Sequence, residues 1–331
     1  MFECDGFKAK TSDELNSYAN RRALRRNESR MLSTSGAATS SLGDPVCQTP
    51  LNVENAEVTQ NRPDVVSYRL AASRGERTAA KGSTMEPELV HSAWLGEFLG
   101  TFILILLGNG VNASVSLRKT YAENAGWMVV TTGWGIAVLC GVLTAQAFGS
   151  PGAHLNPAIS LSAAVISGDF SHLASFWSAQ LLGAMTGATL TWLFFYPHWK
   201  VTPEPGTKLG VFCTGPAIPH LPSNLLGEAT GTFVLVLVAG AIFSHGVSAS
   251  GPAPALGPWL VASLVWGIGL SLGSTTGYAI NPARDLGPRL VHFLLPIAGK
   301  GPSNWRYAPI PIVGDLAGAA LAGLLLRFAH L

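Results

Sequence analysis

The chain has 331 residues, of which 48% are hydrophobic and 12% charged, with a formal net charge of +2 and a mean hydropathy of +0.32. So weak a net charge argues against nucleic acid as a partner, and the scarcity of charged residues is typical of a polytopic membrane protein. The cysteines have neither metal-site nor disulfide spacing, and no nucleophile–base pair is recognisable. We therefore expect no metal, no cofactor and no enzymatic activity.

The first 84 residues differ in kind from the rest. They are polar, rich in Ser, Asn and Arg, and contain no apolar run long enough for a membrane span or a signal peptide. Residues 1–84 are predicted to be a disordered tail. A cluster of arginines between residues 21 and 30 is interpreted as solvated, with contact to anionic lipid as the alternative. Met85 reads as an ordinary start for a membrane domain, which we assign to residues 85–331.

From Trp94 onward, apolar segments alternate with turn-rich loops. Each segment approaches the roughly 20 residues that a helix needs to cross a bilayer. Six spans are predicted, at about 94–116, 128–148, 173–195, 224–245, 258–275 and 309–329. Lys and Arg in the short loops leave the orientation open.

The pattern of spans occurs twice. Three short segments match across the halves: Leu95–Glu97 with Leu226–Glu228, Gly100–Phe102 with Gly231–Phe233, and Trp134–Ile136 with Trp266–Ile268. Repeat one covers about 90–200 and repeat two about 222–331. Each repeat holds three spans, and an odd number of spans inverts the second repeat in the membrane relative to the first.

A short helix is predicted in each repeat, after an Asn-Pro-Ala motif. The motifs are Asn156-Pro157-Ala158 and Asn281-Pro282-Ala283. Asn is a favourable N-cap and Pro is favoured at the first helical position, so helices should cover 158–165 and 283–291. At about 15 Å each is half the thickness of the hydrocarbon core, which indicates two half-helices that meet at the membrane centre.

This arrangement predicts a pore for neutral molecules. Two helix N-termini near the bilayer centre each carry about +0.5 charge, which repels cations but not neutral solutes. The Asn156 and Asn281 amides should cap their helices and keep their N–H groups free to donate to a hydroxyl or a water. The loops 152–155 and 277–280 place carbonyls at membrane depth, which is tolerated only where they line a wet cavity.

With these motifs and this repeat, the chain from about Trp94 to its C-terminus resembles the aquaporin (major intrinsic protein) family. The sequence NPARD, which includes Asp285, and the following GPR resemble the glycerol-facilitator branch. The resemblance implies an all-α membrane protein with six transmembrane helices and two half-helices in an inverted 3+3 repeat. It also implies a homotetramer in the lipid bilayer of the plasma membrane, with both termini cytoplasmic.

The resemblance further assigns residues to roles. The selectivity filter comprises Trp134, Gly269, Tyr278 and Arg284, and the pore lining adds Gly152, Ala153, His154, Thr276 and Gly277. Glu97 and Glu228 brace the pore loops by accepting backbone N–H groups, and Asp285 is structural. The loop AQAFGSPGAH is two residues longer than usual, so Trp134 is placed by aligning its helix rather than by counting back from Asn156.

These assignments predict a passive channel for glycerol and other small neutral solutes, with some water, that excludes ions and protons. Trp134 and Tyr278 would contact the carbon backbone of a polyol while Arg284 donates to its hydroxyls. Gly269 would leave open the width that His occupies in water-selective relatives. The alternatives are a predominantly water-conducting channel and a secondary transporter. The ranking of glycerol, urea, ammonia, hydrogen peroxide and metalloid acids stays open.

Asp315 departs from the facilitator pattern, in which Pro is more common at this position. It lies six residues after Pro309, about 9 Å along the sixth span at helical rise. A carboxyl group there should be neutral, paired, or at a seam between subunits. We expect the change Asp315→Asn to preserve conduction.

Overall fold

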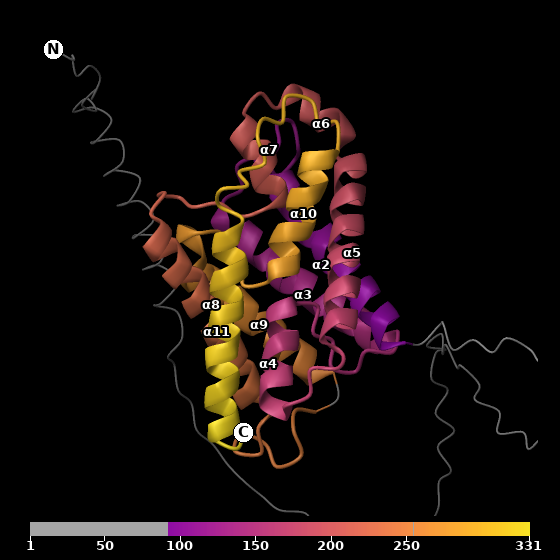
Figure 1. Cartoon of the computed structure of the whole chain (residues 1–331). Helices are drawn as coiled ribbons and strands as arrows, with labels where there is room; N and C mark the ends of the chain where they lie inside the picture. Colours follow the sequence, from indigo (N-terminus) through magenta and orange to yellow (C-terminus); the bar gives the residue numbers. More distant parts are fainter. Residues whose placement is uncertain (1–91, 254) are drawn as a thin grey trace, which may run out of the picture. The chain divides into compact units, whose positions relative to one another are not determined.

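The computed structural model describes residues 92–253 and 255–331, and the predicted tail at 1–84 lies outside them (Figure 1). The secondary structure of the described residues is helical, without strands. The elements are α2 (Ala93–Ser116), α3 (Trp127–Ala147), α4 (Pro157–Ser167), α5 (Leu173–Phe194), α6 (Tyr196–Val201), α7 (Pro205–Phe212), α8 (Leu221–Phe243), α9 (Leu256–Ser271), η2 (Gly273–Thr275), α10 (Pro282–Leu294) and α11 (Pro309–Phe328).

The six predicted spans correspond to α2, α3, α5, α8, α9 and α11. By length and composition, α2, α3, α8 and α11 are each able to cross a membrane. The fifth prediction, 258–275, is wrong at its end, because α9 stops at Ser271 and a 3₁₀ turn follows. A Cβ on Gly273 would lie 2.5 Å from the Tyr278 ring. Only a glycine at this turn leaves space for that ring.

Two short helices, α6 and α7, were not predicted. They lie between the third and fourth spans, where the sequence has no apolar run of span length. Pro205 occupies the first turn of α7, a position where proline favours helix initiation. This connection between the repeats is therefore ordered structure, and its end reaches the functional site.

The packing of the helices repeats across the two halves. In repeat one α2 packs against α3 and α5, and in repeat two α8 packs against α9 and α11. The half-helix α4 packs against α11, and its counterpart α10 packs against α5, so each half-helix rests on the last span of the other repeat (Figure 1). Contact between α3 and α9 joins the repeats.

Glycines set the closest crossings at equivalent places. A Cβ on Gly183 of α5 would lie 2.3 Å from the carbonyl oxygen of Phe98, and one on Gly318 of α11 would lie 2.2 Å from that of Ala229. Phe98 and Ala229 are equivalent, since each follows the matched Gly-Glu pair of its repeat. Small residues at such crossings let membrane helices approach closely, and here any side chain would force them apart.

Candidate functional site

Each half-helix begins at the asparagine of its Asn-Pro-Ala motif. The Asn156 Oδ1 accepts the backbone N–H of Ala158 at 2.8 Å. The Asn281 Oδ1 accepts those of Ala283 at 3.0 Å and Arg284 at 3.2 Å. Pro follows at the first turn of both helices. The prediction that these asparagines cap two half-helices is confirmed, with α4 and α10 having 11 and 13 residues.

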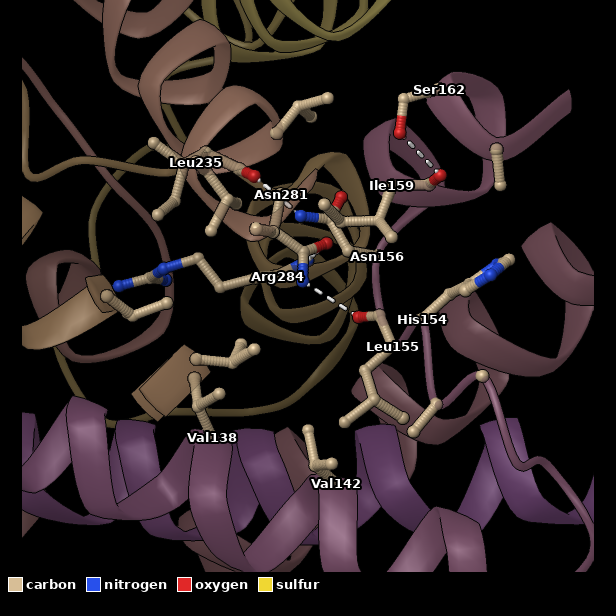
Figure 2. Close-up of a pocket in the computed structure, with 18 of the residues that line it drawn as sticks. Val138, Val142, His154, Leu155, Asn156, Ile159, Ser162, Leu235, Asn281 and Arg284 are labelled. Carbon is tan, nitrogen blue, oxygen red and sulfur yellow. Dashed lines mark hydrogen bonds between the residues drawn. The ribbon is translucent and has the colours of Figure 1, made fainter. Parts of the chain in front are cut away.

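The asparagine amides also join the two repeats. The Nδ2 of Asn156 donates to the carbonyl of Ile280 at 2.6 Å, and that of Asn281 donates to the carbonyl of Leu155 at 2.8 Å (Figure 2). The prediction that both amides keep their N–H groups free is therefore wrong in part. Since an amide has two N–H groups, one on each asparagine remains for a solute.

The loops that lead to the half-helices have an unusual backbone. Ala153 and Leu155 in the first loop have φ values of 41° and 52°, and Tyr278 and Ile280 in the second have 37° and 41°. Residues with a Cβ seldom adopt this left-handed region, which costs about 1–3 kcal/mol per residue and persists only where the surroundings impose it. The same positions are affected in both repeats.

Two buried glutamates supply part of that constraint. Glu97 accepts the backbone N–H groups of His154 at 2.8 Å and Leu155 at 2.7 Å. Glu228 accepts those of Ala279 and Ile280, both at 3.1 Å. Both glutamates are fully buried. This is the geometry that a bracing role requires, because otherwise these N–H groups would face the interior without an acceptor.

Two cavities meet at three of the predicted filter residues. The α4-side cavity, of about 310 Å³, lies between the half-helices and contains both asparagines. The α7-side cavity, of about 580 Å³, lies beside the end of α7. The residues that line both are Trp134, Tyr278 and Arg284. They therefore form the boundary between the two cavities.

The geometry at this boundary combines an aromatic face with a cation. The guanidinium carbon of Arg284 lies 4.0 Å from the centre of the Trp134 ring, a cation–π contact. The Nη1 of Arg284 donates to the carbonyl oxygen of Phe212 at 3.4 Å. Both side chains are buried. The aromatic and the guanidinium thus reach one point from different repeats.

Gly269 occupies a different place from the one predicted. It lines neither of these cavities, and a Cβ there would lie 2.8 Å from the Cζ and the hydroxyl oxygen of Tyr278. The Nε1 of Trp127 donates to the Gly269 carbonyl at 3.0 Å, and the Trp127 ring packs edge-on against Tyr278. The prediction of an open gap at Gly269 is wrong, because the Tyr278 ring fills it.

The other predicted lining residues divide between the cavities. Gly152, Ala153 and His154 line the α4-side cavity, and Gly277 lines the α7-side cavity. Thr276 lines neither and is buried behind Tyr278, whose backbone N–H donates to its Oγ1 at 3.3 Å.

Asp285 lies outside both cavities, in a buried ion pair. Its Oδ1 accepts the Nε of Arg289 at 2.8 Å, and its Oδ2 accepts the backbone N–H of Thr214 at 2.8 Å. Arg289 also donates hydrogen bonds to the carbonyl oxygens of Thr214 and Ser303. Asp285 therefore connects α10 to the chain that follows α7.

Sequence reasoning missed Asn112 and the carbonyls at the end of α7. Asn112 is buried in α2 and lines the α7-side cavity. An amide inside a mostly apolar span was the available signal, since polar side chains at membrane depth seldom lack a role.

A cluster of charges lies outside the spans, between the α2–α3 loop and the start of α7. Arg118 pairs with Glu123 at 3.0 Å and with Glu204 at 2.9 Å. The backbone N–H of Lys119, and then Arg118, hold the pKa of Glu123 below its usual value. Arg118 lowers the pKa of Glu204, and the two glutamates raise that of Arg118. Arg118 and Glu204 are exposed and Glu123 is partly exposed, so solvent weakens both pairs.

Two inverted repeats, with half-helices whose N-termini meet at the α4-side cavity, define an integral membrane protein of the aquaporin fold. The chain belongs to the major intrinsic protein family, whose model matches residues 85–326. It is 53% identical over 233 residues to glycerol uptake facilitator protein 3 of Lactiplantibacillus plantarum, across 70% of this chain and 94% of the relative. It is 48% identical over 241 residues to the glycerol uptake facilitator protein of Bacillus subtilis, across 72% and 85%.

Among solved structures, the chain is similar to the aquaglyceroporin from Plasmodium falciparum. The TM-score is 0.62 at 26% identity, across 71% of this chain and 94% of the other. The predicted resemblance to the glycerol-facilitator branch of the family is confirmed by these comparisons.

Proposed function

We propose that this protein is a passive channel for glycerol and other small neutral solutes, with some permeability to water. The observation that carries the proposal is the boundary formed by Trp134, Tyr278 and Arg284 between the two cavities. Its two aromatic side chains suit the carbon backbone of a polyol, and the planar guanidinium suits adjacent hydroxyls. The names of the facilitator relatives support the same solute class.

Exclusion of ions follows from the same geometry. A cation that enters from the α7-side cavity meets the buried guanidinium of Arg284 first, and one that enters from the α4-side cavity meets the N-termini of α4 and α10 first. These positive ends oppose cations and leave neutral solutes unaffected. Urea and similar small neutral molecules fall within the proposed range, whereas protons and metal ions do not.

The setting of the channel is part of the proposal. We place it as a homotetramer in the plasma membrane, with one pore in each subunit and both termini cytoplasmic. The α4-side cavity then opens to the cytoplasm, because α4 enters from the same face as the end of α11 (Figure 1). The resemblance to the family supports this assembly and orientation.

The test is solute flux into liposomes that contain the purified protein. Light scattering under a glycerol gradient should show uptake well above that of empty liposomes, and a sucrose gradient should show faster water movement. Arg284→Ala should admit charged species without blocking glycerol. Faster water movement with no gain in glycerol uptake would contradict the proposal and favour a water channel.

A further inference from the structure

Asn112 of α2 contacts Trp134, one of the three residues at the boundary between the cavities. The residue is 8% exposed and lines the α7-side cavity. The Oδ1 accepts the indole Nε1–H of Trp134 at 3.0 Å. The Nδ2 lies 3.3 Å from the carbonyl oxygen of Gly210 and 3.3 Å from that of Val211. One amide thus connects the aromatic wall of the site to the end of α7.

The chemistry of the partners fixes how this amide is oriented. An indole N–H can only donate and a backbone carbonyl can only accept, so the amide oxygen must face Trp134 and the amide nitrogen must face α7. A leucine of similar size offers neither group. An aspartate would set a carboxylate against two carbonyls. Asparagine is therefore suited to hold both neighbours at once.

The end of α7 carries the second half of the connection. The last carbonyls of a helix lack partners within the helix, and here they accept side-chain donors. Gly210 and Val211 accept from Asn112, and the next carbonyl, that of Phe212, accepts from Arg284. Trp134 of repeat one and Arg284 of repeat two are therefore held by one short segment, with Asn112 as the connecting side chain.

The indole is confined on its other sides as well. A Cβ on Gly108 would lie 2.3 Å from the Cζ3 of Trp134, so the bare backbone of α2 lies against the ring edge. Arg284 lies over its face. The hydrogen bond to Asn112 restricts the remaining rotation of the ring. The same bond occupies the indole N–H, which is the only hydrogen-bond donor of the side chain.

We propose that Asn112 is a positioning residue that determines the selectivity of the channel by fixing the plane of the Trp134 indole and occupying its N–H. Arg284 is then the side chain that donates to a solute at this point, and Trp134 presents only carbon. This inference rests on the proposed function, since selectivity among polyols has meaning only in a channel that conducts them.

The first test compares solute fluxes in liposomes. Asn112→Leu frees the indole, so the ratio of five-carbon polyol flux to glycerol flux should rise about threefold to fivefold, which is the effect of losing one hydrogen bond of ordinary net strength. Ser114→Leu is the matched control, because Ser114 lies two residues further along α2 and lines neither of the two cavities. It should leave the ratio unchanged.

A double-mutant cycle separates this role from general packing. Trp134→Phe removes the indole N–H and keeps an aromatic face. If Asn112 acts through that N–H, adding Asn112→Leu to Trp134→Phe should change the polyol ratio little further. An additional change as large as that of Asn112→Leu alone would overturn the proposal.

The second test does not depend on solute flux, so it distinguishes a failure of this inference from a failure of the proposed function. In ¹⁵N-tryptophan-labelled protein, the indole signal missing from Trp134→Phe identifies Trp134. In Asn112→Leu this signal should shift and its N–H should exchange faster with solvent. An unshifted signal with unchanged exchange would show that Asn112 does not hold the indole. Wild-type protein that conducts no glycerol would refute the proposed function alone.

Discussion

The two pore loops follow the same course with different polar support. The first loop depends on Glu97, which accepts from the Ser150 Oγ and the Gln180 Nε2 in addition to two backbone N–H groups. The second depends on Glu228, whose donors in the described chain are two backbone N–H groups. Equivalent backbone geometry in the two loops therefore does not require equivalent side-chain partners. The glutamate of the first loop accepts more hydrogen bonds than that of the second.

The clearest difference is between Gln180 and Asp315. Each lies three residues before the glycine of an equivalent crossing, Gly183 or Gly318. The Gln180 Nε2 donates to Glu97 at 2.8 Å. Asp315 accepts from the Thr232 Oγ1 at 3.1 Å, and its carboxyl group lies near that of Glu228.

Asp315 therefore stands beside Glu228 where Gln180 stands beside Glu97, with a carboxyl group in place of an amide donor. The expectation that Asp315 is paired fits its bond to Thr232. Asp315 is fully buried within a single chain, so the alternative of a subunit seam does not apply.

The loops also differ in what they present to the cavities. Tyr278 and Arg284 lie three residues before and three after Asn281, whereas Ala153 and Ile159 occupy the same positions around Asn156. At these two positions the second loop and its half-helix supply an aromatic ring and a guanidinium, and the first supplies small or aliphatic groups. We therefore expect selectivity to be concentrated at the boundary formed by the second loop.

The largest expected effect comes from removing the support of the first loop. Glu97→Leu leaves several buried donors without an acceptor, at about 1–3 kcal/mol each. We expect it to prevent assembly, with little monodisperse protein in size-exclusion chromatography. Glu228→Leu should be milder, and thermal unfolding of purified protein compares the two. Equal or greater damage from Glu228→Leu would refute the difference drawn between the loops.

The next largest effect is expected from a change beside Tyr278, the aromatic residue that the second loop has and the first lacks. Gly269→His should push the Tyr278 ring toward Arg284, since even a Cβ would meet that ring at 2.8 Å. Glycerol flux should fall about tenfold or more and water flux by less than about threefold, because a narrower site discriminates by solute size. Paired light scattering under glycerol and sucrose gradients measures both.

Two alanine variants serve as the control for this prediction. A Cβ on Gly267 of the same helix meets nothing within 4 Å. Gly267→Ala should therefore leave both fluxes unchanged, whereas Gly269→Ala should lower glycerol flux. Equal loss of glycerol and water flux in an assembled Gly269→His protein would mean that Tyr278 does not set the width of the path.

A smaller effect is expected at Asp315. Asp315→Asn places an amide donor beside Glu228, as Gln180 does beside Glu97, so glycerol flux should stay within about twofold of wild type. Asp315→Leu leaves Glu228 and Thr232 without this polar partner and should lower flux and thermal stability. If the Asn variant loses flux in an intact assembly, the carboxyl group has a role that an amide cannot supply.

The smallest effect is expected at the exposed charge cluster. Lowered pKa values for Glu123 and Glu204 mean that their pairs with Arg118 stabilise the fold above the ordinary value of 4.5 and lose that contribution as pH falls below it. Because all three groups are at least partly exposed, Arg118→Ala should hardly change the melting temperature at pH 7. A large drop there, absent at pH 3, would show that the cluster matters more than exposure allows.

The sequence predicted the parts of the fold that repeat. The spans follow from apolar length, the half-helices from Asn-Pro, and the inversion from the odd number of spans in each repeat. The end of α9 was missed because the predicted span ignored Gly273 and the Ser and Thr residues after it, and because the sequence does not show that the Tyr278 ring packs against Gly273. The helices α6 and α7 were missed because they are too short for a periodic signal.

The predictions for individual site residues depended on contacts between distant segments. Capping by Asn156 is local and was predicted, whereas its bond to Ile280 spans 124 residues and was not. Gly269 was predicted to leave a gap in the filter, because a sequence does not show that the Tyr278 ring packs against this glycine. Asn112 was overlooked for the same reason, since its partners lie on α3 and α7.

The exchange of half-helices between repeats has a consequence for biosynthesis. The surface on which α4 rests belongs to α11, which follows it by well over a hundred residues, and the amide of Asn156 finds its acceptor only once Ile280 has been made. The first repeat therefore cannot complete its own packing when it is synthesised. The pore is finished only after the second repeat has entered the membrane.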